Sequence, residues 1–175
     1  MKNICTRINI TVLKILKIML KKIFAAIILV LIIFILTEEK IYIAAETENA
    51  TEIVATVDAE KNLPLVISFL HSVQKTPVIE ELEFDGEKFI LLRTKYQSQG
   101  VGLPFMESDG VFREEGEFFI MDDMNRAIKN LELRTGVGTE LTVTLNGQEF
   151  KLFEKFPAGT KILIDAVPRF EILLK

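Results

Sequence analysis

The sequence has 175 residues, with 21 Lys or Arg against 25 Asp or Glu and a formal net charge of -4. That length suits one domain, with or without an appended segment, and a hydrophobic content of 49% excludes a disordered chain. The single Cys and the single His exclude a disulfide framework, a Cys-rich zinc site and a multi-His metal site. We therefore expect no metal and no other cofactor.

The charge is unevenly distributed along the chain. Residues 1–45 carry seven basic and two acidic residues, which leaves 14 basic and 23 acidic residues, or a net charge of -9, in the remainder. An acidic domain without a basic stripe repels phosphate backbones, so we expect no nucleic-acid partner. The glycine pairs in 100–102 and 136–138 lack the rest of any phosphate-binding fingerprint.

Basic residues precede an unbroken apolar run at residues 23–36, IFAAIILVLIIFIL. This pattern is typical of a secretory signal, whose positive charges stay cytoplasmic while the following chain is exported. Fourteen residues rise about 21 Å, which is less than a hydrocarbon core of about 30 Å. The short run favours cleavage at Ile43-Ala44-Ala45, and an uncleaved signal anchor is the alternative. Both Met1 and Met19 fit as the start of such a signal.

These features divide the chain into three segments. Residues 1–45 form a basic region followed by an apolar signal peptide or short signal anchor, and the polar residues 46–51 form a tether. Residues 52–175 form an exported α+β domain, located in the periplasm, outside the cell or on the outer side of the cytoplasmic membrane. The single thiol, Cys5, lies outside this domain, a composition that suits an oxidising compartment.

The first half of the domain predicts the order β-α-β-β. Residues 52–57 are rich in β-branched side chains and predict a strand. Residues 78–84 and 87–96 flank Asp85-Gly86, the residue pair most typical of a β-hairpin turn. Between them, Asp58 suits the N-cap of a helix reaching about Gln74. The apolar residues at helical spacing in this segment are Leu63, Val66, Ile67, Leu70 and Val73.

The second half predicts the same order. A loop over 97–109 and strands at 110–112 and 117–121 precede a helix that begins at Asp122 or Asp123. A second hairpin follows around Asn146-Gly147, and then a last pair of strands. We predict an α+β fold of mostly antiparallel sheet with two helices, built as two β-α-β-β units of ferredoxin-like type or from hairpins that share turn residues by convergence. In this second half, the predicted helix carries its apolar face at Met124, Ala127, Ile128 and Leu131. The hairpin strands are 141–145 and 148–153, and the last two strands are 161–166 and 169–174, broken at Pro168.

The element order over residues 52–96, after a short membrane segment, resembles the periplasmic ferredoxin-like domains of type IV pilus and type II secretion assembly proteins. The resemblance rests on the order of elements, without a diagnostic motif. It implies a membrane-anchored assembly component of a pilus or secretion-type machine. Those proteins usually place a coiled coil after the membrane helix, whereas this sequence shows no coiled-coil heptads.

Residues that support catalysis are few. His71 falls at the edge of the apolar face of the first predicted helix, and no Gly-x-Ser-x-Gly elbow supplies a nucleophile for it. We interpret His71 as a structural residue that forms local hydrogen bonds. Paired carboxylates are the machinery of glycosidases, so a small exported hydrolase would use Glu114, Glu115 or Asp122. Ordinary ion pairs and a helix start are the simpler interpretation of these acidic residues.

The loop gives the best candidate for an interaction surface. Leu103, Pro104, Phe105 and Met106 lie between strands with no periodicity that would bury them, and exposed apolar patches mark partner sites. A tip folded back onto the core is the alternative. We predict an exported or membrane-tethered, non-enzymatic module that binds a protein or another cell-envelope component. The alternatives are the hydrolase and the anchored assembly component.

Overall fold

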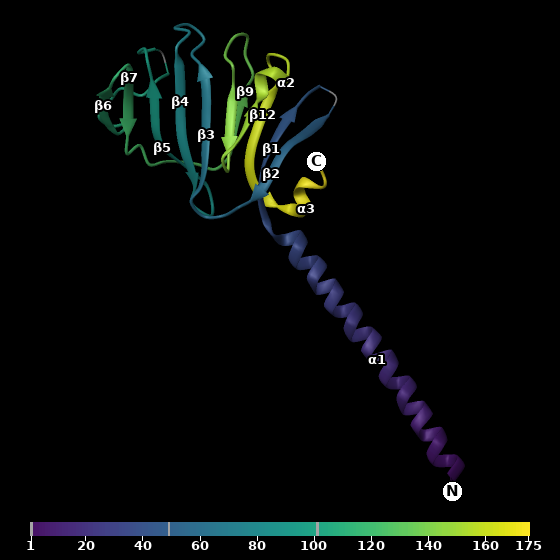
Figure 1. Ribbon diagram of the computed structural model, residues 1–175. Coiled ribbons are helices and arrows are strands. Elements are labelled where there is room, and N and C mark those ends of the chain that lie inside the picture. The colour runs from purple at the N-terminus through teal and green to yellow at the C-terminus, as the bar shows by residue number, and fades with distance from the viewer. Residues whose placement is uncertain (1, 49, 101) are drawn as a thin grey trace.

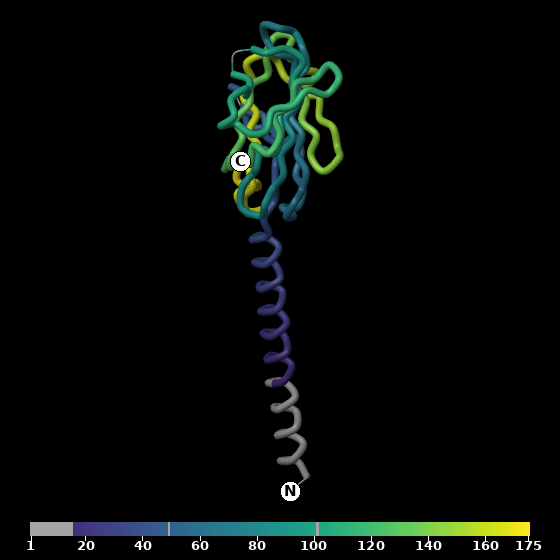
Figure 2. The backbone as a smooth tube through the Cα atoms, turned by 90° about the vertical axis from the view of Figure 1, so that its left-hand side faces the viewer, coloured from purple at the N-terminus to yellow at the C-terminus, as the bar shows by residue number. Residues whose placement is uncertain are grey.

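The computed structural model describes residues 2–48, 50–100 and 102–175, with side chains from residue 16 onward within these ranges. One long helix projects from a body made mostly of β-strands, and both views show the helix leaving one end of the body (Figure 1, Figure 2). The body consists of antiparallel sheets, and the structure is largely β, with a few helices.

The N-terminal helix α1 covers Lys2–Thr37. Its segment Leu16–Thr37, with 22 residues, is long and apolar enough to cross a membrane, and none of that segment is buried against the body. At about 1.5 Å per residue it is about 33 Å long, comparable to a hydrocarbon core of about 30 Å. The apolar helix is therefore consistent with a signal anchor or a membrane span.

A four-stranded sheet follows directly after α1. Its first strand, β1, begins at Glu39 and lies between two neighbours, because it pairs with β12 along its whole length and with β2 on the other side. Residues 41–45 are fully buried. The predicted cleavage site at 43–45 thus lies inside β1, and the predicted tether, residues 46–51, begins with the last residue of β1 and ends with the first residue of β2. The strand order is β2 (Thr51–Asp58), β1 (Glu39–Glu46), β12 (Lys161–Pro168) and β9 (Leu131–Arg134).

An eight-stranded sheet forms the other half of the body. Both predicted hairpins are present in it, with β4 and β5 joined across Asp85-Gly86 and β10 and β11 joined across Asn146-Gly147. Strand β6 is at one end of the order, and β8 pairs separately with β5. The order is β11 (Gln148–Lys151), β10 (Thr142–Leu145), β3 (Leu63–Leu70), β4 (Pro77–Phe84), β5 (Phe89–Tyr96), β7 (Phe118–Asp122) and β6 (Val111–Glu115), with β8 at Arg126–Ile128.

The main core lies between the two sheets. Ile41 and Ile43 of the four-stranded sheet share one buried cluster with Leu65, Ile67 and Val143 of the eight-stranded sheet. Each such side chain contributes about 1.5–3 kcal/mol when it is fully buried. Since β1 supplies residues to the centre of this core, the folded body begins at Glu39.

The first predicted helix, over residues 58–74, is wrong. The structure places β3 at Leu63–Leu70, paired with β4 and β10. Leu63, Leu65 and Ile67 alternate along the strand and are all buried, so the same apolar residues fit a period of two as well as a helical period. The strand prevails because β4 and β10 pair with it on both sides, while its apolar face packs against Ile41 and Ile43 of the four-stranded sheet.

The second predicted helix, beginning at Asp122 or Asp123, is also wrong. Asp123 and Asn125 have positive φ angles of 54° and 46°, which turn the backbone instead of continuing a helix. Asp and Asn tolerate this left-handed conformation better than other side chains with a Cβ. The chain then forms β8 and β9, and Ile128 and Leu131 lie in these two short strands.

The last predicted strand, 169–174, is replaced by a helical turn. Helix α3 covers Arg169–Ile172 after Pro168, and a second short helix, α2, covers Leu152–Lys155. Residues 52–96 contain β2 to β5 without a helix. The predicted β-α-β-β units are therefore not present, and the structure does not have the element order on which the ferredoxin-like resemblance rests.

Candidate functional site

His71 lies at the base of the loop over residues 97–109. It follows β3, is buried, and accepts hydrogen bonds at Nδ1 from the backbone N–H groups of Val73 (3.3 Å) and Gln74 (3.2 Å). The loop passes close to the same ring, since a Cβ added at Gly100 would lie 2.9 Å from Nε2 of His71. The imidazole therefore organises one turn and packs against the start of the loop, which is the behaviour of a structural residue.

Tyr96 holds the loop near its tip. Its side chain is fully buried at the end of β5, and its hydroxyl donates a hydrogen bond to the carbonyl oxygen of Pro104 at 2.5 Å. Burial raises the pKa of Tyr96, and the negative charge of Asp109 raises it further. The hydroxyl group therefore stays protonated and remains a donor. Leu103 and Pro104 are half-buried, so this part of the predicted patch is turned toward the protein.

The next two residues point into solvent. Phe105 is 64% exposed and Met106 is 56% exposed. They lie on a closed turn, in which Asp109 accepts a hydrogen bond from the N–H of Met106 (3.2 Å) and donates its own N–H to the carbonyl of Met106 (2.9 Å). Asp109 also forms an ion pair with Arg126 at 3.3 Å. Two apolar side chains are thus presented on a hydrogen-bonded support.

Strand β6 carries two further exposed apolar side chains that the sequence did not predict. Val111 and Phe112 are both exposed, and no described strand pairs with the outer edge of β6. The ring of Phe112 stacks on Phe119 at 6.0 Å, and Phe119 contacts Tyr96 at 5.8 Å. An aromatic row therefore runs from the buried Tyr96 to the free sheet edge. We call the four exposed apolar residues Phe105, Met106, Val111 and Phe112 the edge patch; Val111 and Phe112 are neighbours on β6 and point to opposite faces of the sheet at its free edge.

The carboxylate predicted for a hydrolase at Asp122 is bound by two arginines. Arg113 donates to it from β6 at 2.5 Å, and Arg93 donates from β5. Burial alone would raise the pKa of Asp122, but the hydrogen bonds from Arg113 and Arg93 outweigh burial and lower the pKa. Arg93 also contacts Glu81 at 3.2 Å. Charged side chains therefore link β4, β5, β7 and β6 across one face of the sheet.

Glu115 and Glu114 do not complete a catalytic pair with Asp122. Arg113 binds Glu115, and that hydrogen bond lowers the pKa of Glu115. Glu114 is exposed on β6. A general acid needs a raised pKa, whereas Asp122 and Glu115 are held in the charged form. The structure thus brings two of the three candidates to one arginine, in an arrangement suited to ion pairing.

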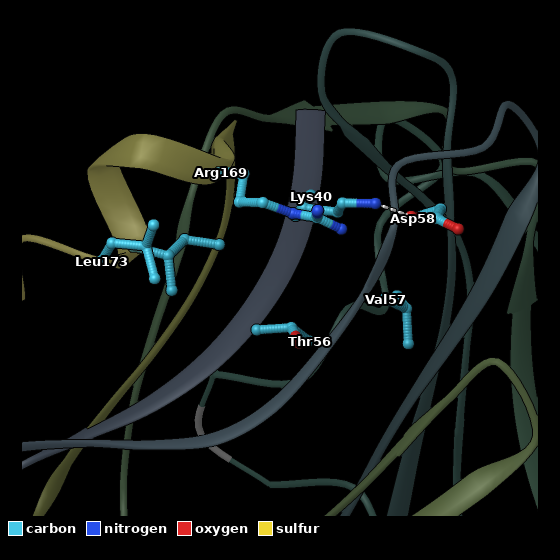
Figure 3. Close-up of a pocket in the computed structure, with 7 residues that line it drawn as sticks. Lys40, Thr56, Val57, Asp58, Arg169 and Leu173 are labelled. Carbon is cyan, nitrogen blue, oxygen red and sulfur yellow. Dashed lines mark hydrogen bonds and ion pairs between the residues drawn. The ribbon is translucent and has the colours of Figure 1, made fainter. Parts of the chain in front are cut away.

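A groove of 330 Å³ lies where α1 meets the body (Figure 3). Lys40 binds Asp58 there and lies 3.2 Å from Glu38, while Arg169 of α3 lies 3.8 Å from Glu38. The hydrogen bond to Asp58 raises the pKa of Lys40. Both cations therefore have acidic partners within the protein. Across the described part of the chain, no group of three or more His, Cys, Asp and Glu side chains is placed to hold a metal ion.

Comparison with known proteins gives one match. A protein-family model described as a domain of unknown function (DUF1850) matches residues 65–152, which is half of the chain. No curated protein and no solved structure matches. The matched region runs from β3 to the first residue of α2, so it contains the loop and the edge patch. Strands β1, β2 and β12, together with α1 and α3, lie outside it.

Proposed function

We propose that this chain, which belongs to the DUF1850 family, is a membrane-anchored module that binds a protein partner on the outer side of the cytoplasmic membrane. Helix α1 is the anchor and the edge patch is the binding surface. The observation that carries the proposal is the direct continuation of α1 into β1, a buried strand at the centre of its sheet. The other supports are the exposure of the edge patch and its rigid attachment.

Retention of the anchor follows from the position of β1. The small residues that suit a signal peptidase, Ala44 and Ala45, are fully buried within this strand. A cut after Ala45 would remove most of β1 and leave β12 and β2 without their shared neighbour. The core would also lose Ile41 and Ile43. A chain cut at this point would not keep the fold, so we infer that α1 stays attached.

The orientation follows from the basic residues before the apolar run. Lys21 and Lys22 directly precede it, and Glu38 and Glu39 follow the helix. Lys and Arg near the end of a span favour the cytoplasmic side. The body, whose residues after 45 carry a net charge of -9, is therefore placed outside.

The edge patch suits a protein segment that adds to the sheet as a further strand. The free edge of β6 offers unpaired backbone N–H and carbonyl groups, as in known cases of β-strand addition. Phe105 and Met106 lie just before this strand on a turn that Tyr96 and Asp109 hold in place. Side chains fixed before binding lose less conformational entropy on association. Aromatic residues at the centre of such a surface carry much of the binding energy.

The anchor and its orientation are tested with the native thiol. Cys5 is the single cysteine, and Val137, which lies between β9 and β10, is 85% exposed. A membrane-impermeant maleimide is added to spheroplasts that produce the full chain or the double variant Cys5→Ser, Val137→Cys. We expect labelling at position 137 in intact spheroplasts, and at Cys5 only after permeabilisation. Labelling of Cys5 in intact spheroplasts, or recovery of the full-length chain in the cytosol, would contradict the proposal.

The binding surface is tested by site-specific photo-crosslinking in the native host. A photoreactive residue replaces Phe105, Phe112 or, as a control, Val137, which is exposed but lies outside the edge patch. We expect positions 105 and 112 to give the same discrete adduct and position 137 to give none. Adding Met106→Ser should weaken the adduct formed from position 112. An adduct formed equally from all three positions would count against a specific surface.

A further inference from the structure

Helix α3 presents a second apolar surface, separate from the edge patch. Leu173 is 71% exposed, Leu174 is 81% exposed, and Phe170 is also exposed. The helical hydrogen bonds continue past Ile172, since Leu173 donates its N–H to Arg169 and Leu174 donates to Glu171. Residues spaced by three and four positions lie on one side of a helical turn. Phe170, Leu173 and Leu174 therefore form one apolar group, which we call the α3 patch.

The opposite side of α3 is occupied by the body. Ile172 packs on the outer face of the four-stranded sheet against a buried cluster that contains Tyr42, Ala44 and Leu163. Lys175 lies over the ring of Tyr42, with Nζ 5.0 Å from the ring centroid. These contacts fix the orientation of α3 on the sheet, so that the exposed direction of the α3 patch is set by packing.

The α3 patch lies beside the point where α1 leaves the body. The N–H of Arg169 donates to the carbonyl of Glu38 at 2.9 Å, just after the last residue of α1. Figure 1 shows α3 at the end of the body from which α1 projects, and Figure 3 shows Arg169 of α3 directed toward Lys40 at the start of β1. Any bilayer that α1 spans therefore ends within reach of α3.

The length of the apolar run sets how close the bilayer comes. The span Leu16–Thr37 is about 33 Å long, comparable to a hydrocarbon core of about 30 Å. The apolar run ends at Leu36, and Glu38 follows two residues later. The lipid headgroups of the outer leaflet therefore lie at the level of Glu38 and α3.

We propose that the α3 patch inserts into the boundary between headgroups and acyl chains of the outer leaflet, as a second membrane contact beside α1. The proposal rests on the membrane anchoring proposed above. Phe170, Leu173 and Leu174 enter the boundary, while Arg169, paired with Glu38, lies at headgroup level. Short helices with an apolar side and basic flanks bind membrane surfaces in this manner. Two contacts fix the tilt of the body on the membrane, which a single helix leaves free.

The absence of Trp from the sequence makes the test direct. Three single variants of the full chain, Leu174→Trp, Phe34→Trp and Val137→Trp, are reconstituted in phosphatidylcholine vesicles that carry bromine on the acyl chain near the glycerol end. Phe34 lies in the span and is the positive reference. Val137, 85% exposed between β9 and β10, is the aqueous reference. We expect Leu174→Trp to show a blue-shifted emission maximum and bromine quenching that approaches that of Phe34→Trp. We expect Val137→Trp to show neither.

The outcomes separate the two proposals. If Phe34→Trp is not quenched, the anchor itself is wrong. If Phe34→Trp is quenched while Leu174→Trp behaves like Val137→Trp, the anchor stands and the α3 contact is refuted. A blue shift at position 174 without bromine quenching would mean that protein, such as a second copy of the chain, covers the α3 patch, and this result also overturns the proposal. A Leu173→Ser substitution in the Leu174→Trp background should reduce both signals without changing quenching at position 34.

Discussion

The buried hydroxyl of Tyr96 donates a hydrogen bond to the carbonyl oxygen of Pro104, and this contact ties the loop that carries Phe105 to strand β5. The two residues lie on either side of Gly100, which packs against the ring of His71. The loop is thus held at its base by one ring and near its tip by another. Exposure of Phe105 and Met106 is consequently a fixed property of the fold.

Replacing Tyr96 with Phe should loosen the loop and weaken binding at the edge patch. Loss of one hydrogen bond lowers stability by about 0.5–1.5 kcal/mol, with a further cost if the Pro104 carbonyl stays unpaired. We expect a lower melting temperature by circular dichroism and a weaker photo-adduct from position 105. Val137→Ala, at an exposed position outside the loop, is the control and should leave both quantities unchanged. An equal loss of stability in both variants would argue against a specific role for the Tyr96 contact.

Replacing Ile43 with Ala should destabilise the whole body. Ile43 is fully buried in β1, between Ile164 of β12 and Ala55 of β2. Truncating a buried Ile to Ala leaves a cavity and costs about 2–5 kcal/mol. Denaturant unfolding of the full chain in detergent, followed by circular dichroism, measures the change. Val137→Ala should change the unfolding free energy by less than about 0.5 kcal/mol. A small effect of Ile43→Ala would show that β1 is not integral to the core.

The body should lose stability in acid, because protonation of Asp122 weakens its ion pairs with Arg113 and Arg93. The pKa of Asp122 lies below the ordinary value of 3.8 because Arg113 and Arg93 outweigh the effect of burial. A carboxyl group with a lowered folded-state pKa stabilises the protein above its unfolded pKa, and this contribution is lost as the pH falls through the folded-state pKa. Asp122→Asn should lower stability by about 1.5–3 kcal/mol at neutral pH. It should also reduce the further loss of stability that the wild type shows as the pH is lowered. The exposed Glu114→Gln is the control and should leave both quantities unchanged.

Glu80 should have the opposite pH dependence. Burial raises its pKa above the ordinary value of 4.5, and the charge of Arg126 only partly offsets this increase. A carboxyl group with a raised folded-state pKa stabilises the protein when protonated, so stability is lost as the pH rises from the unfolded pKa through the folded-state pKa. Glu80→Gln should therefore gain stability relative to the wild type as the pH increases over this range. The difference in melting temperature between Glu80→Gln and the wild type, measured at a series of pH values, checks this prediction. A difference that does not change with pH would contradict it.

Features determined by a few adjacent residues could be predicted from the sequence. The apolar run gives the helix with the composition of a membrane span, and the pairs Asp85-Gly86 and Asn146-Gly147 give two hairpins. In each case the local chemistry allows one structure. A turn that requires positive φ selects Gly or Asn, whatever lies elsewhere in the chain.

The two helices could not be predicted correctly, because local pattern did not decide between alternatives. In 63–70 the apolar residues satisfy both a helical and a strand period, and pairing with β4 and β10 decides for the strand.

The helical turn at 169–172, predicted as a strand, does have a local signal in the sequence. Phe170, Leu173 and Leu174 are spaced by three and four positions after a proline, which favours a helical turn over a strand.

The candidate site was only partly predictable for a similar reason. The exposure of Phe105 and Met106 could be predicted because the loop has no pattern that would bury them. Phe112 was not identified, since its exposure depends on β6 being last in the sheet order. The ion pairs of Asp122 depend on the register of β5, β6 and β7, which juxtaposes residues far apart in the sequence. No local pattern contains that register.

The continuity of α1 with β1 also has a mechanical consequence. A pull on the body by a bound partner is transmitted to the bilayer through β1, which is hydrogen-bonded to strands on both sides. Tension along a strand held by two ladders loads many hydrogen bonds in shear at the same time, whereas a peripheral strand peels away one bond after another. The attachment of the body to its helix should therefore resist mechanical force better than a flexible linker joined to an edge strand.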